Sequence, residues 1–224
     1  MQNKTGQPVR PDDPLRVTEI FYSLQGESRN IGFPTVFIRL TGCPLRCGYC
    51  DTAYAFSGGE WMGLDDILDK AGSWSTRYVT VTGGEPLAQQ ACLLLLSRLC
   101  DQGYQVSLET SGALDVGSVD HRVSRVMDLK TPGSGEQKKN RYDNIKLLNR
   151  QDQVKFVICD RADFDWALAK IQEYNLEVCC EILISPVYGK IEPSILAEWV
   201  LESGVQARFQ LQLHKQLWGD RAGR

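Results

Sequence analysis

Runs of apolar and β-branched residues recur along the chain, and segments with helical spacing separate many of them. Residues 35–41 read Thr-Val-Phe-Ile-Arg-Leu-Thr and residues 78–82 read Tyr-Val-Thr-Val-Thr, which is typical of strands. The same pattern predicts strands over residues 15–23, 35–41, 78–82, 105–110, 125–130, 154–159, 177–184 and 207–213. Helices are predicted over residues 64–71, 87–102, 164–174 and 193–202, the second and the last stopped by Gly103 and Gly204.

The alternation of strands and helices predicts an α/β fold in which helices cover a mostly parallel sheet on one or both faces. About six or seven mostly parallel strands, at roughly 30 residues per unit, are too few for an eight-stranded barrel, so we expect a partial (open) β/α barrel. Ligands of such sheets bind beyond the carboxyl ends of the strands. The segments that follow each strand are therefore where chemistry is expected.

Composition indicates one globular domain. The 224 residues are enough for a single core, which we assign to residues 15–218, with residues 1–14 as a flexible polar leader and 219–224 as a tail. The leader lacks the apolar stretch of a signal peptide, and the longest apolar run, residues 91–96, is far too short to span a bilayer. A net charge of −3 without a basic stripe argues against nucleic-acid binding.

Eight cysteines without an export signal indicate a reducing, cytoplasmic location. Cys43, Cys47 and Cys50 cluster in a C-x3-C-x2-C loop, with Gly42 and Gly48 allowing it to curl. A four-ligand zinc site would need another ligand at comparable spacing, and none is nearby. A [4Fe–4S] cube held by three thiolates keeps one iron free for a small molecule. The spacing therefore favours a reactive iron–sulfur cluster.

The other five cysteines are interpreted as structural residues of helices and strands: Cys92, Cys100, Cys159, Cys179 and Cys180. Cys179 and Cys180 are neighbours in a predicted strand, so they would point to opposite faces and could not readily share a metal. His121 and His214 are the only histidines and belong to no motif. A hydrolase built on a histidine base is therefore poorly supported.

Three polar motifs follow predicted strands and should lie at the same sheet edge as the cysteine loop: Gly83-Gly84-Glu85-Pro86, Glu109-Thr110-Ser111-Gly112 and Asp128-Leu129-Lys130. A glycine pair lets a ligand approach the backbone closely, and Glu85 can accept a hydrogen bond from an amino group. Lys130 offers a positive charge to a carboxylate. A tight strand-to-helix turn and a solvated surface lysine remain the alternatives. Arg39 interrupts an apolar strand and is interpreted as the partner of an anion.

The cysteine loop, with an aromatic residue before its third cysteine, and the Gly-Gly-Glu-Pro string together resemble the radical S-adenosylmethionine superfamily. Within it, Leu24-Gln25-Gly26-Glu27, Arg39, Cys50-Asp51-Thr52 and the motifs at 109–112 and 128–130 resemble the 7-carboxy-7-deazaguanine synthase family. The resemblance extends over residues 17–218. It implies a lyase with the radical SAM type of open barrel.

The resemblance also implies how the cofactors are held. Cys43, Cys47 and Cys50 would bind three irons, and S-adenosylmethionine would chelate the fourth. The cofactor-binding residues would be Tyr49, Cys50, Asp51, Gly84, Glu85, Asp128, Leu129 and Lys130, with Glu109 and Ser111 as weaker candidates. Reductive cleavage would give a 5′-deoxyadenosyl radical, and the protein would orient it and exclude solvent.

The substrate implied by the resemblance is 6-carboxy-5,6,7,8-tetrahydropterin, whose ring contracts with loss of ammonia to 7-carboxy-7-deazaguanine, a precursor of queuosine in tRNA. Substrate-binding residues would be Leu24, Gln25, Gly26, Glu27, Arg39 and Thr82. Arg39 offers a two-pronged donor to the carboxylate. The hydroxyl of Thr52 would bind Mg²⁺ together with substrate oxygens and water. The resemblance further implies a homodimer and a flavodoxin or ferredoxin as electron donor, and it assigns no role to His214, Lys215 or the tail.

Two other functions remain open. A glycyl-radical activating enzyme shares the cysteine loop but acts on a protein backbone, so Leu24-Gln25-Gly26-Glu27 with Arg39 argues against it. A non-catalytic iron–sulfur or zinc protein would contain zinc or a cluster with all irons bound by cysteine, and it would never cleave S-adenosylmethionine.

Overall fold

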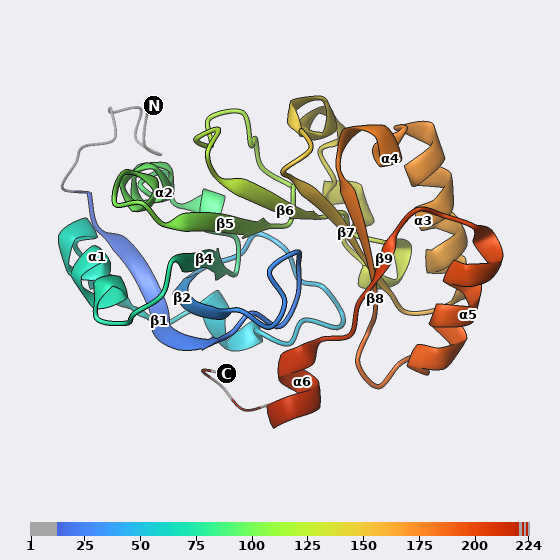
Figure 1. Cartoon of the computed structure of the whole chain (residues 1–224), viewed down its shortest axis with the longest axis horizontal. Helices are drawn as coiled ribbons and strands as arrows, with labels where there is room; N and C mark the ends of the chain where they lie inside the picture. Colours follow the sequence, from blue (N-terminus) through green and yellow to red (C-terminus); the bar gives the residue numbers. More distant parts are fainter. Residues whose placement is uncertain (1–12, 220, 222, 224) are drawn as a thin grey trace.

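A computed structural model describes residues 13–219, 221 and 223, and Figure 1 shows their arrangement. The predicted leader therefore lies outside the described residues except for its last two positions. Of the tail, three residues are described: Gly219, Arg221 and Gly223. Among the residues that the structure describes, no helix is long and apolar enough to cross a membrane.

The described chain folds into one nine-stranded sheet with helices packed against it. The strands are β1 (Leu15–Leu24), β2 (Pro34–Leu40), β3 (Glu60–Met62), β4 (Tyr78–Gly83), β5 (Gln105–Thr110), β6 (Ser124–Asp128), β7 (Gln153–Ile158), β8 (Glu181–Pro186) and β9 (Arg208–Phe209). The helices are α1 (Leu64–Gly72), α2 (Cys92–Asp101), α3 (Arg161–Glu173), α4 (Leu176–Cys179), α5 (Pro193–Ser203) and α6 (Leu213–Trp218).

The strand order β3-β1-β2-β4-β5-β6-β7-β8-β9 confirms the open, mostly parallel α/β fold. The strands from β2 through β4 to β9 run parallel, whereas β1 pairs antiparallel with β2 and with β3. The short, exposed β3 carries no clear strand pattern and was not predicted. Because β3 and β9 form the two edges and do not pair, the barrel stays open.

Two apolar clusters fill the space between sheet and helices. One joins the first strands to α1 and α2, and the other joins β6–β8 to α3, α4 and α5. In Figure 1 these helix groups lie at the two ends of the sheet. Helix α1 shows the pattern that drives this packing, because Leu64, Ile67, Leu68 and Ala71 recur at helical spacing and are all buried.

The predicted helix over 87–102 begins later than expected. Residues Pro86–Ala88 form a single 3-10 turn, and α2 starts only at Cys92. Gln89 has an extended backbone, and its side chain bonds the backbone N–H and C=O of Arg16 and the C=O of Thr41. These bonds hold Gln89 against β1 in an extended conformation, so the helix begins only after it.

The prediction of a strand over 177–184 is wrong at its start. Residues Leu176–Cys179 form the short helix α4, and β8 begins at Glu181. Cys179 and Cys180 therefore do not alternate across a strand, and their sulfur atoms lie 3.5 Å apart. The reason is that Asn175 adopts a left-handed conformation and starts a second helical turn after α3.

The predicted strand over 207–213 is also shorter than expected. Strand β9 contains only Arg208 and Phe209, and α6 begins at Leu213. Gln210 turns its side chain to the backbone of Ser28, accepting from its N–H at 2.9 Å and donating to its C=O at 2.7 Å. The Gln210 N–H still donates to Ile184 of β8, but the side chains of Gln210 and Gln212 and the N–H of Leu213 bond the β1–β2 turn.

Candidate active site

A cavity of about 400 Å³ opens at the carboxyl ends of the parallel strands. It is lined by the turn after β1, the cysteine loop after β2, the ends of β4, β5 and β6, the middle of β7 and the α6 segment. Nearly all predicted site residues meet there: Leu24, Gln25, Gly26, Glu27, Arg39, Cys43, Cys47, Tyr49, Cys50, Asp51, Thr52, Thr82, Gly84, Glu109, Ser111, Asp128 and Lys130. Glu85 and Leu129 are not part of the lining.

The cysteine loop is fixed at its turns by contacts to the segment after β6. The N–H of Gly48 donates to the C=O of Ser134 at 3.0 Å, and the N–H of Arg46 donates to the carboxylate of Glu136 at 2.7 Å. The Arg46 guanidinium lies 4.3 Å from the ring centre of Phe56 and bonds the C=O of Cys43. These contacts pin the loop and leave all three thiols at the cavity.

Burial raises the pKa of the Cys47 thiol to about 11, against the opposing attraction of Lys130. Burial also raises the pKa of Cys43. Both thiols are therefore protonated at neutral pH, and metal binding would displace their protons.

Gly84 is required by close packing against this loop. A Cβ at Gly84 would lie 2.7 Å from the Cβ of Cys43 and would overlap the backbone of Gly42. The glycine pair thus serves the fit between the end of β4 and the cysteine loop, in addition to exposing backbone at the cavity.

The Glu85 side chain is fully buried and does not line the cavity. Its carboxylate accepts hydrogen bonds from the Thr110 hydroxyl, from the N–H and hydroxyl of Ser111, and from the N–H of Leu87. Glu85 therefore ties the end of β4 to the end of β5. Leu129 is fully buried too, and its side chain belongs to the apolar core.

Arg39 is held in place before any ligand arrives. Its Nε donates to the Glu19 carboxylate at 2.7 Å, and its guanidinium carbon lies 5.7 Å from the ring centre of Phe21 and 5.9 Å from that of Tyr54. Tyr54 in turn donates to the same Glu19 oxygen at 2.8 Å. A preset guanidinium at a cavity wall suits recognition of a carboxylate.

Glu27 faces the cavity as a carboxylate. Lys155 donates to it at 2.7 Å and Gln212 at 2.9 Å. Burial alone would raise the pKa of Glu27, but the charge and hydrogen bond of Lys155 outweigh burial and lower the pKa to about 2. Gln25 next to it is buried, donates to Thr80 and accepts from the Glu27 N–H, which fixes the turn.

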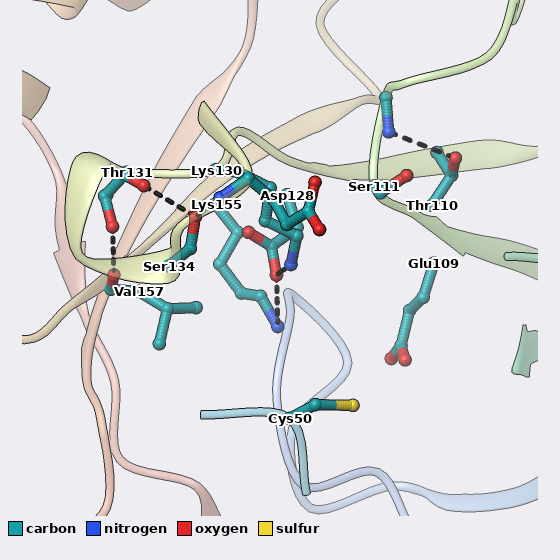
Figure 2. A network of polar contacts seen from close by, with 12 residues as sticks. Cys50, Glu109, Thr110, Ser111, Asp128, Lys130, Thr131, Ser134, Lys155 and Val157 are labelled. Carbon is teal, nitrogen blue, oxygen red and sulfur yellow. Dashed lines mark hydrogen bonds and ion pairs between the residues drawn. The ribbon is translucent and has the colours of Figure 1, made fainter. Parts of the chain in front are cut away.

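Asp128 and Lys130 form an ion pair of 2.9 Å at the end of β6 (Figure 2). The second Asp128 oxygen, Oδ1, is buried and has no hydrogen-bond partner among the residues described. A buried acceptor without a partner is costly, so a hydroxyl or amine of a ligand is expected there. Burial also raises the pKa of Tyr49, which keeps its hydroxyl neutral.

Thr82 and Glu109 join neighbouring strand ends, since the Thr82 hydroxyl donates to Glu109 at 2.9 Å. Burial raises the pKa of Glu109, against the opposing attraction of Lys155. Figure 2 shows Glu109, Lys155 and Cys50 around the same space.

Sequence reasoning missed several residues that line the cavity. Lys155 lies on β7, and Phe21 and Phe37 stack with ring centres 4.9 Å apart. His214 and Lys215 of α6 also line it, although neither belongs to a motif. The only sequence signal for this segment is the pair Gln210 and Gln212 just before α6. Their role becomes clear from the structure, where both side chains bond the β1–β2 turn.

Comparisons with known proteins agree with this geometry. The Radical SAM superfamily profile matches residues 37–133. A 7-carboxy-7-deazaguanine synthase of Chlorobaculum tepidum is 44% identical over 208 residues, covering 92% of this chain and 94% of its own. One from Koribacter versatilis is 39% identical, covering 91% and 97%.

Solved structures support the fold. The crystal structure of QueE from Escherichia coli superposes with a TM-score of 0.75 at 23% identity, covering 90% of this chain and 95% of that one. Streptococcus suis SuiB bound to S-adenosylmethionine gives a TM-score of 0.53 at 16% identity, over 79% of this chain and 47% of SuiB.

Proposed function

The chain belongs to the 7-carboxy-7-deazaguanine synthase family, and from this premise we propose that it converts 6-carboxy-5,6,7,8-tetrahydropterin to 7-carboxy-7-deazaguanine with loss of ammonia. The observation that carries the proposal is that three clustered thiols, a preset arginine and a buried glutamate line one cavity. The thiols suit the radical cofactor, and Arg39 and Glu27 suit an acidic pterin.

The donor set fits a [4Fe–4S] cluster. Among the residues described, no three His, Cys, Asp or Glu side chains converge as ligands of a single ion, although Cys43, Cys47 and Cys50 all line the cavity. Three thiolates at one cavity can bind three irons of such a cube and leave the fourth iron for another ligand. When bound, the cluster and S-adenosylmethionine supply the radical chemistry that removes a hydrogen from the substrate.

Two glycine-to-alanine variants test whether close packing at Gly84 is needed for the loop to hold the cluster. In Gly84→Ala the added methyl group meets Gly42 and Cys43, so we expect the iron content after anaerobic reconstitution to fall at least severalfold. Gly48→Ala is the matched control, because the nearest atom to its added Cβ lies 4.0 Å away and its iron content should equal that of the wild type. Iron and sulfide analysis gives the readout, and equal loss in both variants would contradict the packing argument.

The S-adenosylmethionine subsite is assigned to the ends of β4 and β6. Gly84 lines the cavity, and its backbone would accept from the methionyl amino group, while the Glu85 carboxylate fixes the adjoining strand end through Ser111. The unpartnered Asp128 oxygen accepts from a ribose hydroxyl, and the ion pair with Lys130 orients that carboxylate. Tyr49 and Asp51 border the same part of the cavity.

The pterin subsite is assigned to β2 and the β1–β2 turn. The Arg39 guanidinium binds the substrate carboxylate, since only its Nε donates a hydrogen bond to another described residue. Glu27, held ionised by Lys155, accepts from the amino and amide N–H groups of the pterin. Gln25 holds the turn, backbone groups of Leu24 and Gly26 border the cavity, and Thr82 adds a contact from β4.

Mg²⁺ is proposed at Thr52, whose hydroxyl lies 3.8 Å from the Cys50 sulfur at the cavity wall. One hydroxyl is too few ligands for this ion, so substrate oxygens and waters complete the set. A flavodoxin or ferredoxin as electron donor and a homodimeric state are further parts of the proposal, and both rest on the family.

The test is a direct assay. The anaerobically reconstituted protein is reduced with dithionite and given S-adenosylmethionine and 6-carboxy-5,6,7,8-tetrahydropterin, and the ultraviolet spectrum and mass of a deazaguanine acid are expected. Cleavage of S-adenosylmethionine without that product would favour a glycyl-radical activating enzyme. No cleavage under any reductant would favour a non-catalytic iron–sulfur or zinc protein.

A further inference from the structure

Lys155 is a charged residue in the middle of a buried strand. Its neighbours on β7, Val154 and Phe156, are both fully buried in the core, and the intervening Lys155 side chain points into the cavity. A lysine in such a position is costly unless its charge is paired. The proposed function gives it no role beyond holding Glu27 ionised.

The Lys155 ammonium group pairs with two carboxylates, Glu27 and Asp128. Its Nζ lies 2.7 Å from Oε2 of Glu27 and 3.9 Å from Oδ2 of Asp128. Asp128 is also bonded by Lys130, and Glu27 is also bonded by Gln212. A continuous polar chain thus crosses the cavity from the β1–β2 turn through β7 to β6, and Figure 2 shows its centre.

The two carboxylates at Lys155 belong to different subsites. The proposed function assigns Glu27 to the pterin and Asp128 to the ribose, so one ammonium group would be shared between a substrate contact and a cofactor contact. When pterin N–H groups bond Glu27, they compete with Lys155 for the same oxygen atoms. Lys155 is then freer to pair with Asp128, which holds that carboxylate more firmly for the ribose.

We propose that Lys155 is a positioning residue that couples the binding of the pterin to the binding of S-adenosylmethionine. The inference rests on the proposed function and adds a regulation of its site. Coupling between binding sites is reciprocal, so each ligand should tighten the other by the same factor, here about tenfold. The Lys130 contact to Asp128 alone cannot provide such coupling, because Lys130 does not reach Glu27 in the described structure.

The test measures binding without turnover. The dissociation constant of S-adenosylmethionine is determined by calorimetry on the reconstituted, unreduced holoenzyme, with and without saturating pterin. We expect the pterin to lower it about tenfold in the wild type and in Lys155→Arg, and by less than about twofold in Lys155→Met. Lys146→Met, which removes an exposed lysine paired with Asp143 outside the cavity, should behave as the wild type.

A purely structural role would weaken both ligands without changing their ratio, so the ratio is the decisive readout. Because Lys155→Met leaves the buried Glu27 carboxylate without its cation, the double variant Glu27→Gln/Lys155→Met keeps the test usable if the single variant does not fold, and it too should show a ratio near one. A tenfold ratio that survives in either variant overturns the inference, and so does a wild-type ratio of one. A wild-type protein that binds neither ligand overturns the proposed function as well.

Discussion

Replacing Cys47 by alanine should remove the iron–sulfur cluster and lower the rate of product formation by more than about a thousandfold, equivalent to about 4 kcal/mol. Cys47 lies in a loop at the cavity and not in the apolar core, so the fold should persist. Iron analysis, the absorption of the reconstituted protein and product formation are the measurements.

Cys100→Ala is the matched control for this prediction. Cys100 is a free, half-buried cysteine on α2, outside the cavity lining. This variant should assemble the cluster and turn over at the wild-type rate. A Cys47→Ala protein with full turnover would disprove the assignment of the cluster.

Replacing Arg39 by lysine should raise the KM for the pterin by about 10- to 100-fold, or roughly 1.4 to 2.7 kcal/mol, while S-adenosylmethionine binds as before. Lysine keeps the charge but loses the planar guanidinium and its contacts with the rings of Phe21 and Tyr54. Steady-state kinetics with each ligand varied separately provide the measurement.

Arg122→Lys serves as the control for the arginine, because Arg122 pairs with Asp101 and Asp120 outside the cavity. Its kinetic constants should match those of the wild type. An unchanged pterin KM in Arg39→Lys would show that another group binds the substrate carboxylate.

The site could be predicted from sequence wherever a motif follows a strand directly. Cys43, Gly84 and Asp128 follow or end β2, β4 and β6, and parallel pairing brings those ends to one edge. Local sequence patterns, together with the rule that parallel strands end at one edge of the sheet, were enough to group these residues. The open barrel was predicted separately, from the alternation of strands and helices and from a strand count too low for eight units.

Other features depend on contacts that no local pattern contains. Lys155 alternates with Val154 and Phe156 like a residue on a solvated face, and only the curvature of the sheet places that face inside a cavity. Gln89 looks like an ordinary helical residue until its side chain is seen to bond Arg16. No local pattern predicted that the Glu85 carboxylate accepts hydrogen bonds from Ser111 on the neighbouring strand end.

The contact between the β1–β2 turn and the α6 segment has a consequence for biosynthesis. Ser28 and Gln210 are 182 positions apart, and Leu213 donates to the C=O of Gly26. During translation the turn emerges first and must remain without these partners until the α6 segment has left the ribosome. The side of the cavity formed by the β1–β2 turn and the α6 segment can therefore assemble only after residues up to 213 have been translated, long after the cysteine loop has emerged.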